Sequence, residues 1–127
     1  MGKTKSGFVK RRLKGITYSF KGILILITTE DSIKAQFFIG LFITVFGFIF
    51  NISAIEWMIQ LTIIGVVLVA EALNTAVEKI ADFIHPEYHN KIGVIKDVAA
   101  GAAGFAAIIS IIIGCIIYIP KIMNLLS

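Results

Sequence analysis

The sequence predicts an all-α membrane protein in which one amphipathic surface helix precedes three transmembrane helices. Of the 127 residues, 57% are hydrophobic, and the mean hydropathy of +0.92 is too high for an ordinary soluble domain. Residues 35–55 and 98–120 contain no charged side chain. Each run is as long as the roughly 20 residues that an α-helix needs to cross the hydrocarbon core. The chain is too short for more than one domain, so residues 1–127 are expected to form a single unit.

Residues 1–28 are predicted to form a helix that lies in the membrane interface. On a helical wheel, four residues share a sector of about 80°: Arg11, Lys14, Tyr18 and Lys21. Apolar side chains gather on the opposite side: Leu13, Ile16, Phe20, Ile23, Leu24 and Ile27. Such a helix places its apolar face in lipid and its basic face toward the headgroups. Simple attraction to anionic lipid would explain this pattern equally well. Nucleic acid is not expected as a partner, because the rest of the chain is apolar enough to lie in lipid.

The first transmembrane span is predicted over residues 32–51, after the stretch TTEDSIK. Three hydroxyl residues are candidate N-cap residues for it: Thr28, Thr29 and Ser32. Glu30 and Asp31 are expected in or beside its first turn, where acidic side chains suit the helix dipole.

The second span is predicted over residues 54–85, since Pro86 disfavours helical geometry in the residue before it. The third span is predicted over residues 94–120, closed by Pro120 and Lys121. Small residues near its start let membrane helices approach closely and predict a packing face: Ala99, Ala100, Gly101, Ala103 and Gly104.

The distribution of basic residues predicts the orientation of the spans. Seven basic residues precede the first acidic residue, Glu30, and three more lie between the last turns of the second span and the start of the third. The link between the first two spans, NISAIE, has no basic residue. Because cytoplasmic segments carry the excess of Lys and Arg, the N-terminus and the second link are expected in the cytoplasm.

The second span carries an unusual set of polar residues in the stretch AEALNTAVEKIAD at residues 70–82. Glu71, Glu78 and Asp82 fall within about 40° of one line along a helix, and Asn74 lies about 60° to the side. Glu71 and Glu78 are about 10 Å apart along the axis. Glu71 is therefore expected to be deepest in the membrane and Asp82 nearest the cytoplasm.

Carboxylates inside a membrane cost about 2.5–3.5 kcal/mol at its centre and usually mark a functional site. Near the water line, Glu78 is a candidate ligand for Mg²⁺, with Glu30 as a second carboxylate at similar depth. Glu71, in a drier position, is a candidate general base for a lipid hydroxyl. Lys96 and Arg11 are cations available for phosphate groups. The set predicts phosphoryl transfer to a membrane alcohol, a reaction in which the protein mainly positions groups and neutralises charge.

The same residues resemble the signature of a known family, E-x-x-N-[ST]-[AS]-[IV]-E-x-x-x-D, over residues 71–82. This is the family of small integral-membrane bacterial lipid kinases that includes diacylglycerol kinase and undecaprenol kinase. Further matches extend the resemblance over essentially the whole chain: Gly7-Phe8, Arg11, Tyr18-Ser19, Lys21-Gly22, Glu87-Tyr88-His89 and Lys96-Asp97. The family has no Walker motif, and none is present here.

The resemblance implies a homotrimer in the bacterial cell membrane, with composite active sites between protomers that face the cytoplasm. It implies that Glu71 is the catalytic base and that Glu30 and Glu78 bind Mg²⁺. It also implies that Asn74 and Ser19 order the lipid substrate. The residues implied to contact ATP are Arg11, Tyr18, Glu30, Glu78, Glu87, Tyr88, His89, Lys96 and Asp97.

The expected substrate is undecaprenol, which would be converted to undecaprenyl phosphate. Trp57, Ala100 and Gln36 depart from the diacylglycerol kinase branch, and the first span and C-terminal segment look more like the Gram-positive branch. Diacylglycerol, giving phosphatidic acid, is the alternative substrate. A more distant alternative is a small proton-coupled transporter that uses Glu71, although three spans and a graded set of acids argue against it. A scaffold whose acids only pair between helices is a third possibility, and Asp82 fits a solvated surface acid equally well.

Overall fold

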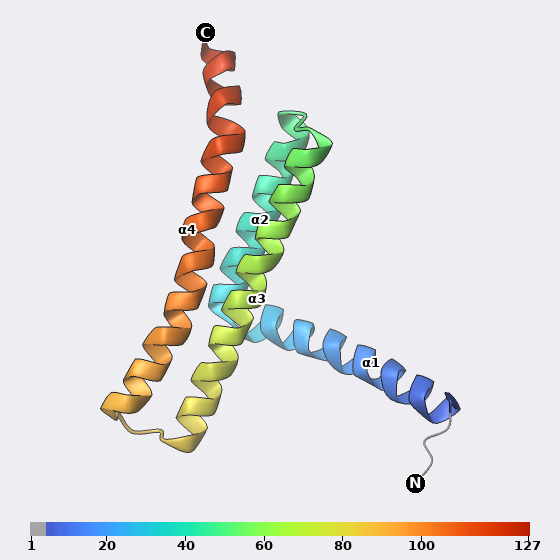
Figure 1. The fold of residues 1–127 in the computed structure, drawn as a ribbon, viewed down its shortest axis with the longest axis vertical. Helices are drawn as coiled ribbons and strands as arrows, with labels where there is room; N and C mark the ends of the chain where they lie inside the picture. The colour runs from blue at the N-terminus through green and yellow to red at the C-terminus, as the bar shows by residue number, and fades with distance from the viewer. Residues whose placement is uncertain (1–4) are drawn as a thin grey trace.

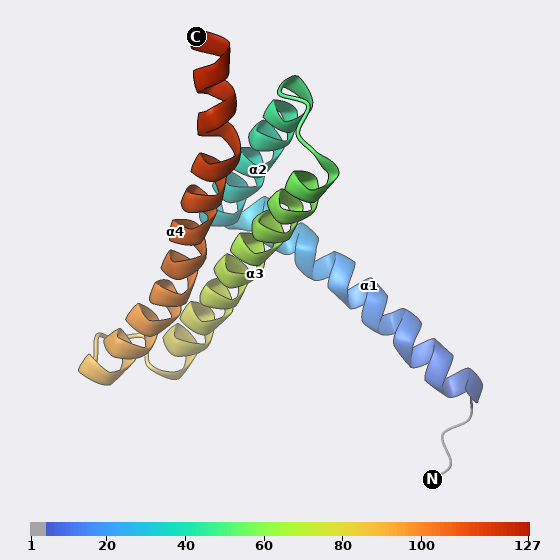
Figure 2. The ribbon, with the colours of Figure 1, turned by 45° about the horizontal axis from the view of Figure 1, so that its top comes forward.

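A computed structural model describes residues 5–127, which form four α-helices. The helices are α1 (Lys5–Thr29), α2 (Asp31–Ile49), α3 (Ala54–Ile84) and α4 (Asn90–Leu126). α2, α3 and α4 run alongside one another as a bundle, and α1 projects sideways from the start of α2 (Figures 1 and 2). The three bundle helices are long and apolar enough to cross a membrane. The predicted all-α architecture is therefore confirmed, while the part of the expected surface helix at residues 1–4 lies outside the described residues.

The bundle helices differ in length, and this difference positions the acidic residues. α2 has 19 residues, whereas α3 has 31 and α4 has 37. α1 therefore joins the bundle part-way along α3, and the last turns of α3 and first turns of α4 extend past it (Figure 1). The α3–α4 link lies at this extended end, and the α2–α3 link and the C-terminus lie at the opposite end (Figures 1 and 2).

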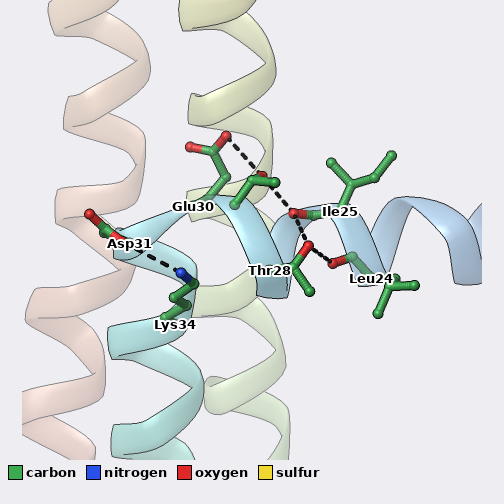
Figure 3. Close-up of polar contacts among 7 residues, drawn as sticks. Leu24, Ile25, Thr28, Glu30, Asp31 and Lys34 are labelled. Carbon is green, nitrogen blue, oxygen red and sulfur yellow. Dashed lines mark hydrogen bonds and ion pairs between the residues drawn. The ribbon is translucent and has the colours of Figure 1, made fainter.

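The start of α2 differs from the sequence expectation. Its N-cap residue is Glu30, in an extended conformation (φ −106°, ψ 112°) and without a side-chain capping hydrogen bond. Thr28 and Thr29 end α1, and their hydroxyls donate to carbonyls one turn back at 2.7 and 2.6 Å (Figure 3). Ser32 lies inside α2. The predicted hydroxyl caps are wrong because only one residue separates the helices, so both threonines still have α1 carbonyls to bond.

The turn between α2 and α3 forms at the expected residues. Asn51 has a positive φ of 50°, which asparagine tolerates better than most residues. Ser53 caps α3 in a capping box, with hydrogen bonds of 3.1 and 3.0 Å exchanged with Glu56. The ring of Trp57 lies over Gly47, where a Cβ would approach the ring to 2.6 Å. Trp57 therefore packs onto α2, and that position of α2 requires glycine.

α4 continues through Pro120 to Leu126, six residues past the predicted end of the third span (Figure 1). A proline inside a helix removes one backbone hydrogen bond and crowds the preceding turn. Contacts on both sides of Pro120 hold the helix in place here. Tyr118 is buried against Ile52, and Nζ of Lys121 lies 3.1 Å from Oε2 of Glu56.

Small side chains bring α3 and α4 together as expected, but only part of the predicted face is used. Ala103 is buried, whereas Ala99 and Gly104 are half-buried. Ala100 and Gly101 are exposed on the surface of α4. One side of the small-residue stripe therefore packs within the chain, and the other side is exposed.

Candidate active site

The polar residues of α3 have graded exposure toward the α3–α4 link. Glu71 is half-buried, and Glu78 and Asp82 are exposed. Within residues 5–127, neither Glu71 nor Glu78 makes an ion pair. The helix thus presents a partly enclosed carboxylate and, two turns further on, a carboxylate open to water. This is the order that the sequence pattern predicts.

Asn74 supplies an unsatisfied polar atom near Glu71. Its Oδ1 is buried and has no hydrogen-bond partner among the described residues. Asn74 also lines a groove of about 600 Å³ between α3 and α4. The other lining residues are small or apolar, apart from one threonine: Thr62, Gly65, Val66, Val69, Ala70, Leu73, Val77, Ala99 and Ala102. A buried carbonyl oxygen without a donor costs free energy, so this position suits a ligand that brings a hydroxyl.

Glu30 is held against α3 by a lysine. Nζ of Lys79 lies 3.1 Å from Oε1 of Glu30, and the Glu30 side chain retains only 23% of its exposure. The hydroxyl of Thr29 lies 3.4 Å from the same carboxylate oxygen (Figure 3). Because Lys79 follows Glu78 directly, this contact brings the α1–α2 junction beside the stretch of α3 that carries Glu78.

Glu30 and Glu78 fit Mg²⁺ in the chemistry of their donor atoms. Mg²⁺ is a hard cation that takes one or two carboxylates and completes its coordination with water and phosphate oxygens. No group of three or more metal-binding side chains converges within the described part of the chain. Two carboxylates leave the other coordination positions of Mg²⁺ to water and phosphate oxygens.

Asp82 is a solvent-exposed acid that also forms an ion pair. Nζ of Lys96, in the second turn of α4, lies 2.5 Å from Oδ1 of Asp82 near the end of α3. The two side chains retain 37% and 59% of their exposure, so the pair is accessible to solvent. It joins the two helices just before their link and holds the ammonium group of Lys96 at the open end of the acidic face.

The link and the start of α4 present aromatic and polar groups to solvent. Tyr88 is 83% exposed, and Glu87, His89 and Asp97 are also exposed. His89 is the N-cap of α4, and its Nδ1 accepts a hydrogen bond from the backbone N–H of Lys91 at 3.1 Å. These groups lie at the same end of the bundle as the Asp82–Lys96 pair.

The predicted site residues on α1 are not brought to this end of α3 within one chain. Arg11, Tyr18 and Ser19 are exposed, and the hydroxyl of Ser19 donates to a carbonyl of its own helix at 3.0 Å. The helix that carries them extends away from the bundle (Figures 1 and 2). α1 packs against α2 near their junction and buries none of its own residues. A single chain therefore brings together the predicted site residues of α3 and α4. Its own α1 does not cover them (Figures 1 and 2).

Two residues near the site were missed by sequence reasoning. Lys79 directly follows Glu78, and a basic residue beside a proposed metal ligand was a visible signal. His85 was considered only as the end of a helix before Pro86. Its ring lies 5.4 Å from the ring of His89, between centroids, in an edge-to-face arrangement. The two histidines are the only ones in the sequence, which could have directed attention to them.

Comparison with known proteins agrees with the family that the sequence motifs resemble. The sequence profile of the family described as prokaryotic diacylglycerol kinase matches residues 17–118. The chain is 35% identical over 114 residues to undecaprenol kinase of Bacillus subtilis (strain 168), covering 90% of this chain and 93% of that protein. It is 29% identical over 117 residues to diacylglycerol kinase of Escherichia coli (strain K12), covering 92% and 95%. A diacylglycerol kinase of Synechocystis sp. is 27% identical over 115 residues, covering 90% and 66%.

Proposed function

This chain belongs to the prokaryotic diacylglycerol kinase family, and from that premise we propose that it transfers the γ-phosphate of ATP to the hydroxyl of undecaprenol. The observation that carries the choice of lipid is the identity of 35% to an undecaprenol kinase, against 29% and 27% to two diacylglycerol kinases. Diacylglycerol is the competing acceptor. The acidic face of α3, with a half-buried Glu71 and an exposed Glu78, is the site of the reaction.

Glu71 acts as the general base. The lipid hydroxyl oxygen attacks the γ-phosphorus, the bond from that phosphorus to the bridging oxygen of ADP breaks, and the hydroxyl proton passes to the Glu71 carboxylate. A carboxylate beside the reacting hydroxyl can take up its proton as the new bond to phosphorus forms. Oδ1 of Asn74 has no donor among the described residues, and it accepts the hydrogen bond of the lipid hydroxyl when the lipid enters the groove. The hydroxyl then turns its single proton to Glu71 for the transfer. Ser19 also helps to position the hydroxyl end of the lipid.

The polyprenyl chain lies in the groove between α3 and α4. Its lining is almost wholly apolar, which suits a hydrocarbon chain, and Asn74 marks one polar position along it. A hydroxyl near Asn74 is then about one helical turn from Glu71, since the residues are three positions apart on α3. The exposed Ala100 on α4 adds no hydrogen-bonding group, which agrees with an acceptor that lacks the two ester groups of diacylglycerol.

ATP binds at the open end of the acidic face. Lys96 and Arg11 neutralise phosphate charge. Exposed groups of the link and of the start of α4 hold the nucleoside: Glu87, Tyr88, His89 and Asp97. Glu30 and Glu78 would hold Mg²⁺, which supplies charge neutralisation on the phosphate oxygens when it is bound. Tyr18 completes the nucleotide contacts from the surface helix.

The enzyme works as a homotrimer with composite sites. Arg11, Tyr18 and Ser19 lie on a helix that extends away from its own bundle, so they are available to a neighbouring protomer. The extended end of the bundle, which carries the α3–α4 link, faces the cytoplasm. The basic α1 and the basic residues of this end support that orientation, because cytoplasmic segments are rich in Lys and Arg.

The deciding experiment is a kinase assay with two lipids. Purified protein in detergent micelles receives labelled ATP with either undecaprenol or diacylglycerol, each at several mole fractions. The proposal expects a higher kcat/KM for undecaprenol. Equal or faster phosphorylation of diacylglycerol would reject undecaprenol as the preferred acceptor while leaving the lipid kinase assignment in place.

A further inference from the structure

The two histidines of the chain lie on the ends of two helices that meet at the α3–α4 link. His85 is the C-cap of α3, and its backbone N–H donates to the carbonyl of Ala81 at 2.9 Å. Pro86 follows and keeps His85 out of the helical conformation. His89 is the N-cap of α4. Because each histidine is fixed by a helix end, the two rings keep a defined separation of 5.4 Å between centroids.

The hydrogen bonds of the two rings assign opposite tautomers. Nδ1 of His85 lies 2.6 Å from the backbone carbonyl oxygen of Glu87. A carbonyl only accepts, so this nitrogen carries the proton, and Nε2 of the neutral ring has a free lone pair. Nδ1 of His89 accepts from the backbone N–H of Lys91, so the proton of that neutral ring is on Nε2. The pair thus offers one hydrogen-bond acceptor and one donor on neighbouring rings.

Adenine has a matching edge. It carries an amino donor on N6 next to an acceptor at N7, whereas guanine presents two acceptors, O6 and N7, on the same edge. An acceptor and a donor held side by side are therefore complementary to adenine and mismatched with guanine. Nearby, the ring of Tyr88 is 83% exposed and presents a face on which a base can stack.

We propose that His85 is a specificity-determining residue that, with His89, recognises the N6–N7 edge of the adenine base of ATP. Nε2 of His85 accepts a hydrogen bond from the N6 amino group, and Nε2–H of His89 donates to N7. With GTP, the lone pair of His85 faces the lone pairs of O6, which repels the base. This inference rests on the proposed function, in which the link residues bind ATP. It adds His85, which is not among the residues that match the family motifs.

The test compares His85→Phe with wild type, using ATP and purine riboside triphosphate, an analogue that lacks the 6-amino group. Phenylalanine keeps an aromatic ring against His89 and removes the acceptor. Wild type is expected to show a KM about five- to tenfold higher for the analogue than for ATP, the effect of one hydrogen bond. His85→Phe is expected to show equal KM values for the two nucleotides, with kcat at saturating ATP close to wild type.

Three further measurements make the outcome unambiguous. In His85→Phe, the ratio of kcat/KM for ATP to that for GTP is expected to fall about fivefold or more, since a repulsive contact with GTP is also removed. His85→Gln, whose side-chain oxygen can lie close to the position of Nε2 of histidine, is expected to recover most of the wild-type preference. Lys91→Ala, which keeps the backbone N–H that fixes His89, is the control and is expected to leave the preference unchanged.

The outcomes distinguish the role of His85 from the proposed kinase function. An enzyme that phosphorylates lipid with ATP, but whose His85→Phe variant still discriminates against the analogue as wild type does, overturns the role of His85 alone. Absence of lipid phosphorylation by wild type with any nucleotide overturns the proposed function itself. If His85→Phe has a low kcat at saturating ATP and an altered elution on size exclusion, the test relies on His85→Gln and on the comparison of ATP with the analogue in wild type. Equal KM values of wild type for ATP and the analogue overturn the inference.

Discussion

The ammonium group of Lys79 on α3 lies 3.1 Å from the carboxylate of Glu30 at the junction of α1 and α2. This contact connects the only non-helical residue between α1 and α2 to the stretch of α3 that carries Glu78. It also means that, without a metal, one of the two proposed Mg²⁺ ligands is neutralised by a neighbouring cation. Binding of Mg²⁺ at Glu30 therefore has to compete with Lys79.

Replacing Lys79 should make the enzyme less dependent on high Mg²⁺. Lys79→Met keeps the aliphatic length of the side chain but removes the competing charge. The pair is partly exposed, since Lys79 retains 65% of its exposure, so its contribution is modest. We expect the concentration of Mg²⁺ at half-maximal activity to fall about two- to fivefold, measured by titrating Mg²⁺ at fixed ATP.

A matched control lies one helical turn from Glu30. Lys34 pairs with Asp31 at 3.8 Å at the start of the same helix, on an exposed surface (Figure 3). Lys34→Met removes the same charge from the same region without touching Glu30, and it should leave the Mg²⁺ requirement unchanged. An equal shift in both variants would mean that only the general surface charge matters.

Glu71→Gln should abolish phosphoryl transfer while preserving the fold. Glutamine has nearly the same shape but cannot accept the hydroxyl proton, and general base catalysis is commonly worth a factor of about 10²–10⁴. Because Glu71 makes no ion pair with any residue from 5 to 127, its neutralisation should not lower the thermal midpoint. Initial rates with saturating undecaprenol and thermal melting in detergent are the two measurements. If the wild-type protein instead transports a proton or solute without consuming ATP, the result would support the transporter alternative.

Glu78→Gln distinguishes a kinase from a scaffold. As a metal ligand, Glu78 should affect activity strongly, with a rise in the Mg²⁺ requirement of about tenfold or more if its bond to the ion is lost. As a structural acid it should affect assembly, although its side chain is exposed and unpaired within the described residues. Size exclusion with light scattering reports assembly, and the kinase assay reports the Mg²⁺ effect. If Glu78→Gln disrupts the oligomer but leaves the kinase activity unchanged, the scaffold interpretation is favoured.

Asn74→Leu should weaken lipid use without weakening the protein. In the present structure Oδ1 of Asn74 is buried and lacks a donor among the described residues, a condition that costs about 1–3 kcal/mol. Leucine removes that cost and matches the apolar groove, so the thermal midpoint should stay the same or rise. The KM for undecaprenol should increase severalfold, while the KM for ATP should not change. A loss of stability in this variant would show that Asn74 is satisfied by a protein group in the assembled enzyme.

Much of the architecture could be predicted from the sequence because lipid imposes strong rules on it. Residues 35–55 and 98–120 contain no charged side chain, and such runs in lipid must form helices to satisfy their backbone groups. Helix boundaries were less predictable. Thr28 and Thr29 have the side chains of N-cap residues, but they bond backward within α1 because the break between the helices is a single residue. The sequence predicts that the third span ends at Pro120. The helix continues past it because the next residue, Lys121, pairs with Glu56, which is distant in sequence.

The candidate site was predictable where its residues share one helix. Glu71, Glu78 and Asp82 lie on one line of α3, and periodicity alone gives their order of exposure. Pairings between elements were not predictable, because sequence spacing does not say which side chains meet across helices. The contacts of Lys79 with Glu30 and of Lys96 with Asp82 belong to this class. The positions of Glu30 and Glu78 near the water line predict them as Mg²⁺ ligands, whereas most of the residues expected to contact ATP are implied only by the family resemblance.

Tyr118→Phe tests whether the bundle end far from the site is purely structural. The Tyr118 hydroxyl donates to Oε1 of Gln60 and lies 3.3 Å from the carbonyl oxygen of Ile43, to which the Gln60 amide donates at 3.4 Å. Gln60 is 2% exposed, so losing the hydroxyl leaves its side-chain oxygen buried without this donor. Such a loss costs about 1–3 kcal/mol.

We therefore expect a clear drop in the thermal midpoint of Tyr118→Phe in detergent, with kcat and both KM values unchanged at a temperature well below it. The double variant Tyr118→Phe/Gln60→Leu removes both partners, and it should recover much of the stability because no polar atom is then left unpaired. Changed kinetics in a fully folded Tyr118→Phe protein would show instead that this end of the bundle is coupled to the acidic face of α3.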